Sequence, residues 1–255
     1  MDSFKHSHSL GQNFLTDKNL LEAIVKDAGI TRNDTVIEIG AGMGALTEPL
    51  AKTGARVISF EIDSRLKPFL SPLSSKYPNL EIIFSDFLKY DLKEIDVTSF
   101  RAVANLPYYI TTPVLFRLLD DDRLSSATVM VQEEVADRIV AKAGGKDYGI
   151  LSVSIQLSGS PKIMRKVGRA MFSPQPNVDS AIVRVDIERK RADEKLLSLV
   201  RAAFSMRRKT LVNCLSKSGY EKTKIINSLS ELGFDQSVRG EKLTPEDFKK
   251  LSALL

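Results

Sequence analysis

The first two thirds of the chain alternate short apolar runs with stretches of helical periodicity. Seven runs rich in apolar and β-branched residues predict strands: Thr35–Ile39, Arg56–Phe60, Leu80–Phe84, Ala102–Ala104, Ala127–Gln132, Leu151–Leu157 and Ala181–Ile187. Helical patterns cover Leu20–Ala28, Ala45–Thr53, Thr112–Leu119 and Glu133–Lys142. Strands that alternate with helices predict an α/β fold, in which helices cover both faces of a mostly parallel sheet.

The last quarter of the chain follows a different pattern, with no strand pattern after about residue 192. Helical patterns cover Leu196–Leu215, Glu221–Leu232 and a segment that starts at Thr244. Thr244 is a suitable N-cap, and Pro245 suits the first position of the last helix. Residues 188–193 (ERKRAD) are highly charged, which is typical of a linker. We therefore expect a sheet domain over residues 1–188 and a small all-helical domain over residues 189–255.

Composition places the chain among folded soluble proteins. Its 255 residues are 43% hydrophobic and 27% charged, which excludes a mostly disordered chain. Cys214 is the only cysteine, so no intrachain disulfide can form, and this favours a reducing compartment. No apolar stretch reaches the length of about 18 residues that a membrane span needs, and the N-terminus lacks the order of a signal peptide. We expect a cytoplasmic protein that does not contact membranes.

Charge is distributed unevenly along the chain. The net charge is +5, from 37 Lys and Arg against 32 Asp and Glu. Residues 1–187 carry 22 basic and 23 acidic side chains, whereas residues 188–255 carry 15 basic and 9 acidic ones. A basic C-terminal quarter suggests a polyanionic partner such as nucleic acid, although a solvated helical face explains the charge equally well.

A glycine turn follows the first predicted strand and opens the next helix. Gly40, Gly42 and Gly44 permit positive φ and a close approach of the backbone to a ligand. Glu61 ends the second strand, where a carboxylate can accept hydrogen bonds from ribose hydroxyls, and Asp86 follows the third, where it can meet an adenine ring. The spacing also fits the dinucleotide pattern GxGxx(G/A). The turn alone therefore leaves a structural turn, a dinucleotide site and an S-adenosylmethionine site open.

The sequence NLPY directly after the fourth strand narrows this choice. It resembles the motif of amino-directed nucleic-acid methyltransferases, and Glu38 before the glycines is also common in methyltransferases of this fold. An exocyclic adenine amine is a weak nucleophile, because its lone pair is delocalised into the ring. The Asn105 side-chain oxygen and the Leu106 carbonyl can each accept a hydrogen bond from one N–H of this amine. Pro107 restricts Leu106 to extended geometry, and Tyr108 offers a ring for base stacking. The structural alternative is a strand-end turn with a core tyrosine.

Further segments carry a family resemblance. NLPYYITTP at residues 105–113, SLGQNFL at 9–15 and FSPQPNVDSA at 172–181 together resemble the ribosomal RNA adenine N6,N6-dimethyltransferases. FSMRRKTL at 204–211 and LTPEDF at 243–248 continue the likeness, which thus covers almost the whole chain. Within this family the chain is most similar to the bacterial small-subunit enzymes.

The resemblance implies a fold, a cofactor and an activity. The fold is a Rossmann-like class I methyltransferase with a seven-stranded, mostly parallel sheet and a small helical C-terminal domain, and the cofactor is S-adenosyl-L-methionine. The implied reaction is dimethylation of two adjacent adenosines near the 3′ end of small-subunit (16S) rRNA, in free RNA or a 30S assembly intermediate. The family also suggests a monomer, and we expect no bound metal.

The resemblance also implies roles for residues at the cofactor. Asn13 and Leu15, from the N-terminal segment, should close over the cofactor. Gly40 should pack by its amino-acid end, Glu61 should hold the ribose and Asp86 the adenine.

Other residues should bind the RNA. Asn105 should touch both the cofactor and the target amine, with Leu106 beside it, and Phe172 should stack on the target adenine opposite Tyr108. The basic residues expected to contact phosphates are Arg207, Arg208 and Lys209.

Two departures and three other functions stay open at this point. His6 and His8 stand where the family often carries Lys or Arg, and Tyr109 follows NLPY where some relatives have a polar residue. One other function is that of the sister enzymes, which methylate large-subunit rRNA and confer macrolide resistance. Another is an assembly factor in which catalysis is dispensable. The third is a nicotinamide-dependent dehydrogenase, which would explain the glycine turn but not NLPY.

Overall fold

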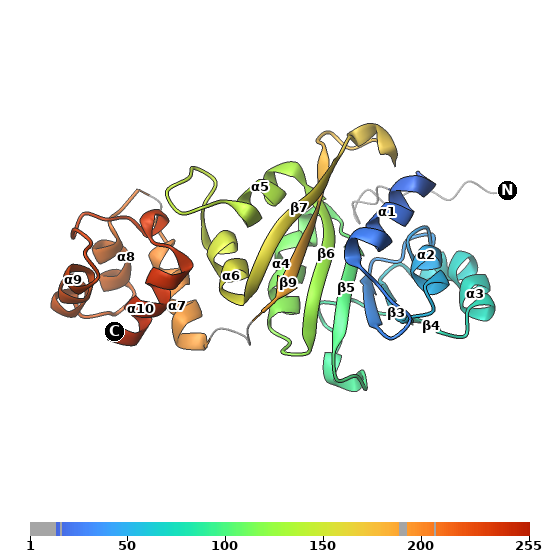
Figure 1. Cartoon of the computed structure of the whole chain (residues 1–255), viewed down its shortest axis with the longest axis horizontal. Helices are drawn as coiled ribbons and strands as arrows, with labels where there is room; N and C mark the ends of the chain where they lie inside the picture. The colour runs from blue at the N-terminus through green and yellow to red at the C-terminus, as the bar shows by residue number, and fades with distance from the viewer. Residues whose placement is uncertain (1–13, 16, 189–192, 207) are drawn as a thin grey trace. The chain divides into compact units, whose positions relative to one another are not determined.

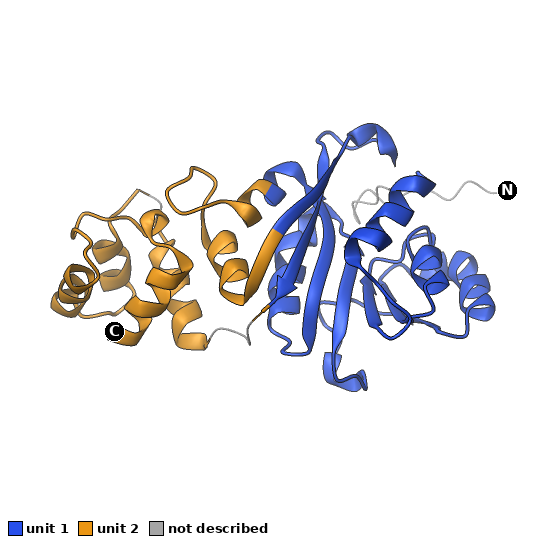
Figure 2. Ribbon diagram, in the orientation of Figure 1, with its two compact units in different colours: residues 1–136, 162–187 blue, residues 137–161, 188–255 orange. Residues whose placement is uncertain are grey.

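The computed structural model describes residues 14–15, 17–188, 193–206 and 208–255 (Figure 1). Contacts divide the chain into two compact units, which Figure 2 colours separately. The sheet unit comprises residues 1–136 and 162–187, and the helical unit comprises residues 137–161 and 188–255. This division differs from the expected one, in which the sheet domain extends without interruption to residue 188.

The sheet unit is built on a seven-stranded sheet in the order β4–β3–β2–β5–β6–β9–β7 (Figure 1). Its strands are β2 (Thr35–Ile39), β3 (Arg56–Glu61), β4 (Leu80–Phe84), β5 (Phe100–Asn105), β6 (Leu124–Gln132), β7 (Gly159–Val167) and β9 (Ser180–Ile187). The pairs from β4 to β6 are parallel, and β9 runs antiparallel to β6. The predicted α/β fold with a seven-stranded, mostly parallel sheet is therefore confirmed.

The strand order places a ligand crevice beside β2. The chain runs outward from β2 through β3 to β4 and then crosses back to β5, on the other side of β2. Open α/β sheets bind ligands at such a reversal, outside the carboxyl ends of the strands. Gly40, Glu61 and Asn105 all lie at carboxyl ends of these strands, so the topology alone brings the expected site residues to one edge.

Helices connect and cover the strands. The helices that begin in the sheet unit are α1 (Lys18–Ala28), α2 (Thr47–Lys52), α3 (Lys67–Lys76), α4 (Thr111–Leu119) and α5 (Glu133–Val140). Short 3₁₀ turns are η2 (Ser64–Leu66), η3 (Leu92–Glu94), η4 (Tyr108–Ile110) and η5 (Arg169–Met171) in this unit and η6 (Gly240–Lys242) in the other. The Asp17 carboxylate caps α1 by accepting the Leu20 amide at 2.8 Å. Leu21 and Ile24 of α1 share one buried core with Leu50 of α2.

The helical unit has its own core. Its remaining helices are α6 (Ile150–Ser158), α7 (Glu194–Ala203), α8 (Leu211–Lys217), α9 (Lys222–Glu231) and α10 (Pro245–Leu254). Leu157 of α6 is buried with Leu199 of α7 and Phe248 of α10, and the Tyr148 hydroxyl donates to the Leu243 carbonyl at 2.9 Å. Because α6 contributes to this core, residues 137–161 group with the C-terminal helices and not with the sheet.

Two expected elements differ from the structure, and one strand was not expected. Leu151–Leu157, expected as a strand, is helix α6. Its polar and apolar residues alternate as they do in a strand, yet serines of this helix are buried together with its apolar residues. The seventh strand is instead β7, an edge strand. Its sequence was not recognised as a strand because it carries several charged side chains. The expected helix Leu196–Leu215 is interrupted between α7 and α8, where Thr210 accepts the Asn213 amide at 3.3 Å and starts a new helix.

Among the described residues, none of the helices combines the length and the apolar character that crossing a bilayer demands.

Candidate active site

The glycine turn after β2 is fastened to the end of β3. The amides of Gly40 and Ala41 both donate to the Phe60 carbonyl, at 2.9 and 3.0 Å. The Gly42 amide donates to Oε2 of Glu61 at 2.8 Å. Gly40 and Gly42 have φ values of 84° and 57°, which residues with a side chain rarely adopt. Three successive amides are thus satisfied by β3, and that strand sets the position of the turn.

Glu61 is held in one orientation at the end of β3. Its second oxygen, Oε1, accepts the Asp63 amide at 2.8 Å. The side chain is buried, and it also lines the cavity described below. Burial raises the pKa of Glu61 above its ordinary value, while the backbone amides of Asp63 and Gly42 oppose that rise. Each carboxylate oxygen keeps a further lone pair, so Glu61 can still accept hydrogen bonds from a diol.

Glu38 supports the turn from within the core and does not line the cavity. It is fully buried, and its Oε2 accepts the Ser59 hydroxyl at 2.5 Å, while its Oε1 has no partner among the described residues. Burial raises the pKa of Glu38 to about 7; the Ser59 hydrogen bond opposes this rise, and the nearby charge of Glu61 adds to it. The protonated form is favoured because the charged form would lose its hydration.

Asp86 begins a tight turn after β4. Its Oδ1 accepts the Leu88 amide at 3.0 Å, and its carbonyl accepts the amides of Lys89 and Tyr90 at 2.9 and 3.0 Å. The other carboxylate oxygen lies 3.7 Å from the Lys89 ammonium. The Asp86 side chain therefore shapes its own loop and still borders the cavity.

An aromatic cluster supports the Asp86 turn from behind. The rings of Phe87 and Phe60 pack edge to face, with centroids 5.3 Å apart. Arg117 of α4 donates to the Tyr90 carbonyl and places its guanidinium 5.9 Å from the centroid of the Phe87 ring. Neither Phe87 nor Arg117 was expected at the site from the sequence. A lone Phe or Arg in a helix or loop carries no signal of its own; only the fold shows that they hold this turn.

Asn105 is the last residue of β5, next to the glycine turn. A Cβ atom at Gly40 would lie 3.7 Å from the Asn105 carbonyl oxygen, so the missing side chain keeps the space between the two strand ends open. The Leu106 amide donates to the Met130 carbonyl of β6 at 3.4 Å, which continues the strand pairing past Asn105. The Tyr108 hydroxyl lies 2.9 Å from Oγ of Ser180.

Tyr108 is half-buried, and burial raises its pKa above the ordinary value, against the effect of the Ser180 hydrogen bond. The phenol is therefore neutral at physiological pH.

A two-stranded sheet joins the N-terminal segment to the FSPQP segment. β1 (Phe14–Leu15) pairs antiparallel with β8 (Phe172–Ser173), and Leu15 lies opposite Phe172. The side chains of Leu15 and Phe172 are both buried, and both line the cavity. The residue expected at the cofactor and the residue expected at the target base are therefore neighbours.

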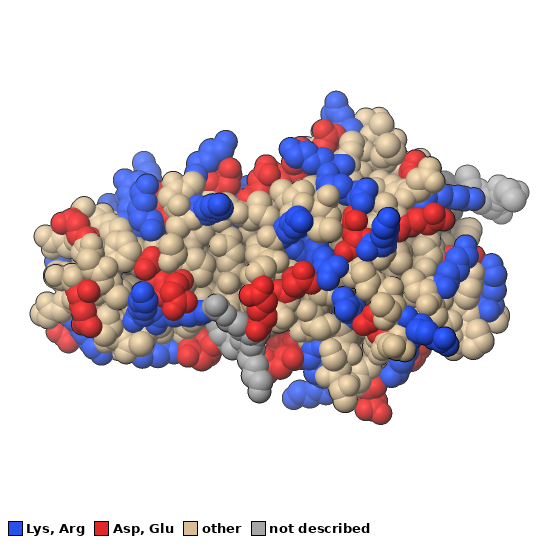
Figure 3. Space-filling view, in the orientation of Figure 1, with Lys and Arg blue, Asp and Glu red and all other residues tan. Residues whose placement is uncertain are grey.

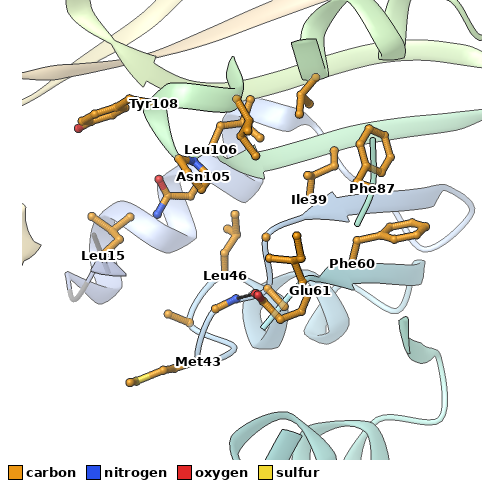
Figure 4. A pocket seen from close by; sticks show the side chains of 18 of the residues that line it. Leu15, Ile39, Met43, Leu46, Phe60, Glu61, Phe87, Asn105, Leu106 and Tyr108 are labelled. Carbon is orange, nitrogen blue, oxygen red and sulfur yellow. Dashed lines mark hydrogen bonds between the residues drawn. The ribbon is translucent and has the colours of Figure 1, made fainter. Parts of the chain in front are cut away.

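These segments surround a cavity of about 380 Å³ (Figure 4). The residues expected at the cofactor or the target base that line it are Leu15, Gly40, Glu61, Asp86, Asn105, Leu106, Tyr108 and Phe172. In Figure 4, Asn105 lies between Glu61 on one side and Tyr108 on the other. Asn13, also expected at the cofactor, lies outside the described residues. The structure thus brings the expected residues that it describes into one site of the size typical for small ligands.

Residues beside the expected ones also line the cavity, among them Met43, Ile62, Ser85 and Tyr109. Each is within one residue of a position that the sequence does single out. These residues could have been predicted from their position next to expected site residues, because a strand end or a turn brings adjacent residues to the same ligand.

The basic residues expected to bind RNA lie in the helical unit. Arg208 and Lys209 are exposed between α7 and α8, and neither pairs with a carboxylate in the part of the chain that the structure describes. Arg207 lies outside the described residues. In Figure 3, Lys and Arg side chains gather along the upper edge of the helical unit, whereas both signs of charge are mixed over the sheet unit.

Known proteins similar to this chain act on ribosomal RNA. Residues 3–255 match the family model described as ribosomal RNA adenine dimethylase. The chain is 46% identical to ribosomal RNA small subunit methyltransferase A of Shouchella clausii, over 99% of this chain and 90% of that protein. It is 42% identical to the protein of the same name from Alkaliphilus oremlandii, over 98% and 91%.

Solved structures agree with the sequence comparison. A dimethyladenosine transferase from Plasmodium falciparum superposes with a TM-score of 0.80 at 28% identity, covering 93% of this chain and 95% of that one. The 23S rRNA methyltransferase ErmE superposes with a TM-score of 0.73, also at 28% identity, covering 95% and 99%. On the extent of these matches, the chain belongs to the ribosomal RNA adenine dimethylase family.

Proposed function

We propose that this protein dimethylates the N6 amines of two adjacent adenosines near the 3′ end of small-subunit (16S) rRNA, with S-adenosyl-L-methionine as the methyl donor. The observation that carries the proposal is the position of Asn105. It ends β5 at the cavity, with the glycine turn and Glu61 on one side and Tyr108 on the other (Figure 4). The small-subunit relatives at 42 to 46% identity support the choice of RNA.

The cavity has two halves that meet at Asn105. The cofactor half contains Gly40, Glu61 and Asp86, and the base half contains Tyr108 and Phe172. The cofactor half fits S-adenosyl-L-methionine: Glu61 offers free lone pairs to ribose hydroxyls, Asp86 offers a carboxylate to an adenine amine, and Gly40 leaves room beside Asn105. The bound cofactor would supply a methyl group activated by a sulfonium.

The base half would prepare the target amine. The Asn105 side-chain oxygen and the Leu106 carbonyl would each accept a hydrogen bond from one N–H of the amine. These two hydrogen bonds favour a pyramidal nitrogen with an available lone pair. Tyr108 and Phe172 would stack on the adenine, which has to leave its RNA stack to enter a cavity of this kind. Holding the amine in line with the methyl donor supplies much of the rate, as positioning does in other displacement reactions.

The same residues can serve both transfers without a general base. Methylation makes the nitrogen cationic, so it then loses a proton readily to water. The monomethylated amine keeps one N–H, and one of the two acceptors, Asn105 or Leu106, can still orient it for the second transfer. None of the carboxylates at the site needs to take a proton from the amine in this scheme.

The helical unit would bind the RNA backbone. Exposed Arg208 and Lys209 are free to meet phosphates, and Arg207 would join them. We propose that the protein acts as a monomer on small-subunit rRNA within a 30S assembly intermediate, in the cytoplasm, where the single buried cysteine, Cys214, stays reduced.

The large-subunit reaction is the second candidate, because ErmE shares the fold over nearly the whole chain. The higher identity to the small-subunit relatives weighs against it. Expressing the protein in a macrolide-sensitive host separates the two, since a gain of resistance would favour the large-subunit reaction. Family membership and the NLPY motif leave no place for the nicotinamide-dependent alternative.

The direct test is incubation with labelled S-adenosyl-L-methionine and small subunits that lack the modification, followed by mapping of modified nucleotides. We expect dimethyladenosine at two adjacent positions near the 3′ end. Absence of label in adenosine N6, when a known dimethyltransferase labels the same subunits, would refute the proposal.

A further inference from the structure

Tyr109 borders the cavity but has no role in the proposed chemistry. It follows Tyr108 in the turn η4, and the residue is 57% exposed. In a 3₁₀ turn, which has three residues per turn, consecutive side chains point about 120° apart. The Tyr108 hydroxyl lies 2.9 Å from Oγ of Ser180, so Tyr109 points away from that contact. It is exposed and belongs to the residues that line the cavity.

Some other exposed apolar side chains belong to segments that contribute to the cavity. Among the described residues, the large apolar side chains with high exposure are Ile62, Phe69, Tyr109, Met171 and Val178. Met171 directly precedes Phe172, which lines the cavity, and Val178 lies two residues before Ser180. Three of the five thus lie on segments that build the base half. Single exposed apolar residues are normal on a protein surface, but Tyr109 is both exposed and part of the cavity lining.

The chemistry of the substrate indicates what covers this surface. A base that enters the cavity remains joined through the sugar–phosphate chain to its neighbours, so a neighbouring base must lie at the mouth. That base has lost one stacking partner, and an exposed aromatic ring can replace it. We propose that Tyr109 is a stacking platform for the base next to the target adenosine, a subsite that rests on the proposed function.

Charge at the rim is compatible with an RNA strand. Arg169, in the turn η5 beside Met171, is exposed, and its guanidinium donates to the Asn177 carbonyl at 3.1 Å. Guanidinium has five N–H donors, so most of them are available to a phosphate. Oδ1 of Asp179 accepts the Arg169 backbone amide at 2.9 Å, so this carboxylate helps to hold the turn.

The platform also gives a reason why the reaction involves two adjacent adenosines. When one of them occupies the cavity, the other can occupy the platform. Moving the RNA by one nucleotide then brings the platform base into the cavity and the next base along onto the platform. Tyr109 would therefore hold the second adenosine next to the cavity while the first is methylated.

The test compares Tyr109→Ala with Tyr109→Phe as a matched control that keeps the ring. The substrate is small-subunit RNA assembled with ribosomal proteins, carrying either the natural adenosine pair or an abasic nucleotide on one side of the target. We expect Tyr109→Ala to raise KM for the RNA about tenfold, because stacking one base on an aromatic ring contributes roughly 1–3 kcal/mol. The kcat at saturating RNA and the dissociation constant for the cofactor should not change, and Tyr109→Phe should resemble the wild type.

The abasic substrate identifies the partner of the ring. For the wild type, an abasic nucleotide at one neighbour position should raise KM as much as Tyr109→Ala does, whereas the variant should not respond to it. An abasic nucleotide two positions further away serves as the control. Equal KM values for wild type and Tyr109→Ala, or equal losses from the abasic nucleotide in both proteins, would overturn the subsite. A wild type that methylates none of these RNAs would instead refute the proposed function.

Discussion

The cofactor half and the base half of the cavity are held in place by different interactions. In the cofactor half, the amides of Gly40, Ala41 and Gly42 are all bonded to the end of β3, and both oxygens of Glu61 accept backbone amides. In the base half, Tyr108 has one side-chain hydrogen bond, to Ser180. The cofactor half therefore has a geometry fixed by the backbone, while the base half is built mainly from side-chain surfaces.

This difference matches what each half has to bind. A cofactor has one structure, so a preformed site binds it without reorganisation. The base half has to admit an adenine extruded from RNA and then hold both its unmethylated and monomethylated forms. Aromatic faces accept such changes because stacking depends little on which hydrogens the ring carries. Substitutions in the two halves should consequently have separable effects.

The largest effect is expected at the junction of the halves. Asn105→Ala removes the side chain that we propose as one acceptor for the target amine. Loss of a single preorganised hydrogen bond at a reacting group costs on the order of 100- to 1000-fold in kcat. RNA binding, measured by filter retention, should be largely kept. The exposed Asn213→Ala is the matched control and should leave kcat unchanged. Loss of both catalysis and RNA binding in Asn105→Ala would contradict its assignment to the chemistry.

The next largest effect is expected on the free energy of unfolding, through Glu38, which is buried beneath the glycine turn. The pKa of Glu38 is raised to about 7 in the folded protein from 4.5, so between these values the folded state binds more protons than the unfolded state. The free energy of unfolding must then fall as pH rises through this window. Between pH 5 and pH 8, deprotonation of Glu38 should lower the free energy of unfolding by about 2–3 kcal/mol.

Glu38→Gln keeps an acceptor for Ser59 and removes the titration. Urea unfolding at several pH values should show that the variant lacks this part of the pH dependence and is more stable than the wild type at pH 8. Parallel pH profiles for the two proteins would show that Glu38 is not protonated in the fold.

A change confined to the cofactor half should affect one ligand only. Glu61→Gln leaves a single oxygen where two amides, those of Gly42 and Asp63, now have separate acceptors. Hydrogen bonds to charged groups contribute about 1.5–3 kcal/mol, so the dissociation constant for S-adenosyl-L-methionine should rise roughly 10- to 100-fold. Calorimetry measures this, with exposed Glu22→Gln as control. RNA affinity should stay the same, and an equal loss for RNA would mean that the halves are not separable.

The reciprocal change belongs to the base half. Phe172→Leu keeps most of the buried volume but removes the aromatic face, so KM for the RNA should rise about tenfold. Cofactor affinity should be retained, because Leu15 keeps its backbone pairing with residue 172. A matching loss of cofactor affinity would show instead that the β1–β8 pair transmits changes between the halves.

The sequence predicts some residues of the candidate site better than others. Glu61 and Asn105 could be placed at the ligand edge because they end inner parallel strands, and Asp86 could be placed there because it follows the parallel edge strand β4. The position of Arg117 could not be found, because it depends on how α4 packs against the Asp86 turn. Nor does sequence spacing show that Leu15 and Phe172 are paired.

The errors in the fold have a similar origin. In Leu151–Leu157 polar and apolar residues alternate with the period of a strand, although the segment is buried on nearly all sides as part of α6. Edge strand β7 carries the polar pattern of a surface segment. Both errors lie where the two units join along the sequence, and they are also why residues 137–161 were expected in the sheet domain.

The smallest effect is expected outside both halves, at the exposed charges of the helical unit. Arg208→Gln combined with Lys209→Gln should weaken RNA binding a few-fold at physiological salt, because two phosphate contacts are lost. The slope of log affinity against log salt should decrease by about 0.9 for each contact to duplex RNA, if duplex RNA releases counterions as DNA does. Exposed Lys217→Gln with Lys222→Gln removes the same charge elsewhere in this unit and should leave the slope nearly unchanged.

Cofactor affinity should not respond to either pair of substitutions, since the cavity is lined by residues of the sheet unit. If the Arg208 and Lys209 pair lowered cofactor affinity as much as RNA affinity, the net charge of +6 in the last quarter would have to act on the sheet unit and not on phosphates. If the control pair lowered the salt slope equally, the helical unit would attract RNA through its overall charge and not through a defined contact. Separate slopes for the two pairs would locate the backbone contact at the start of α8.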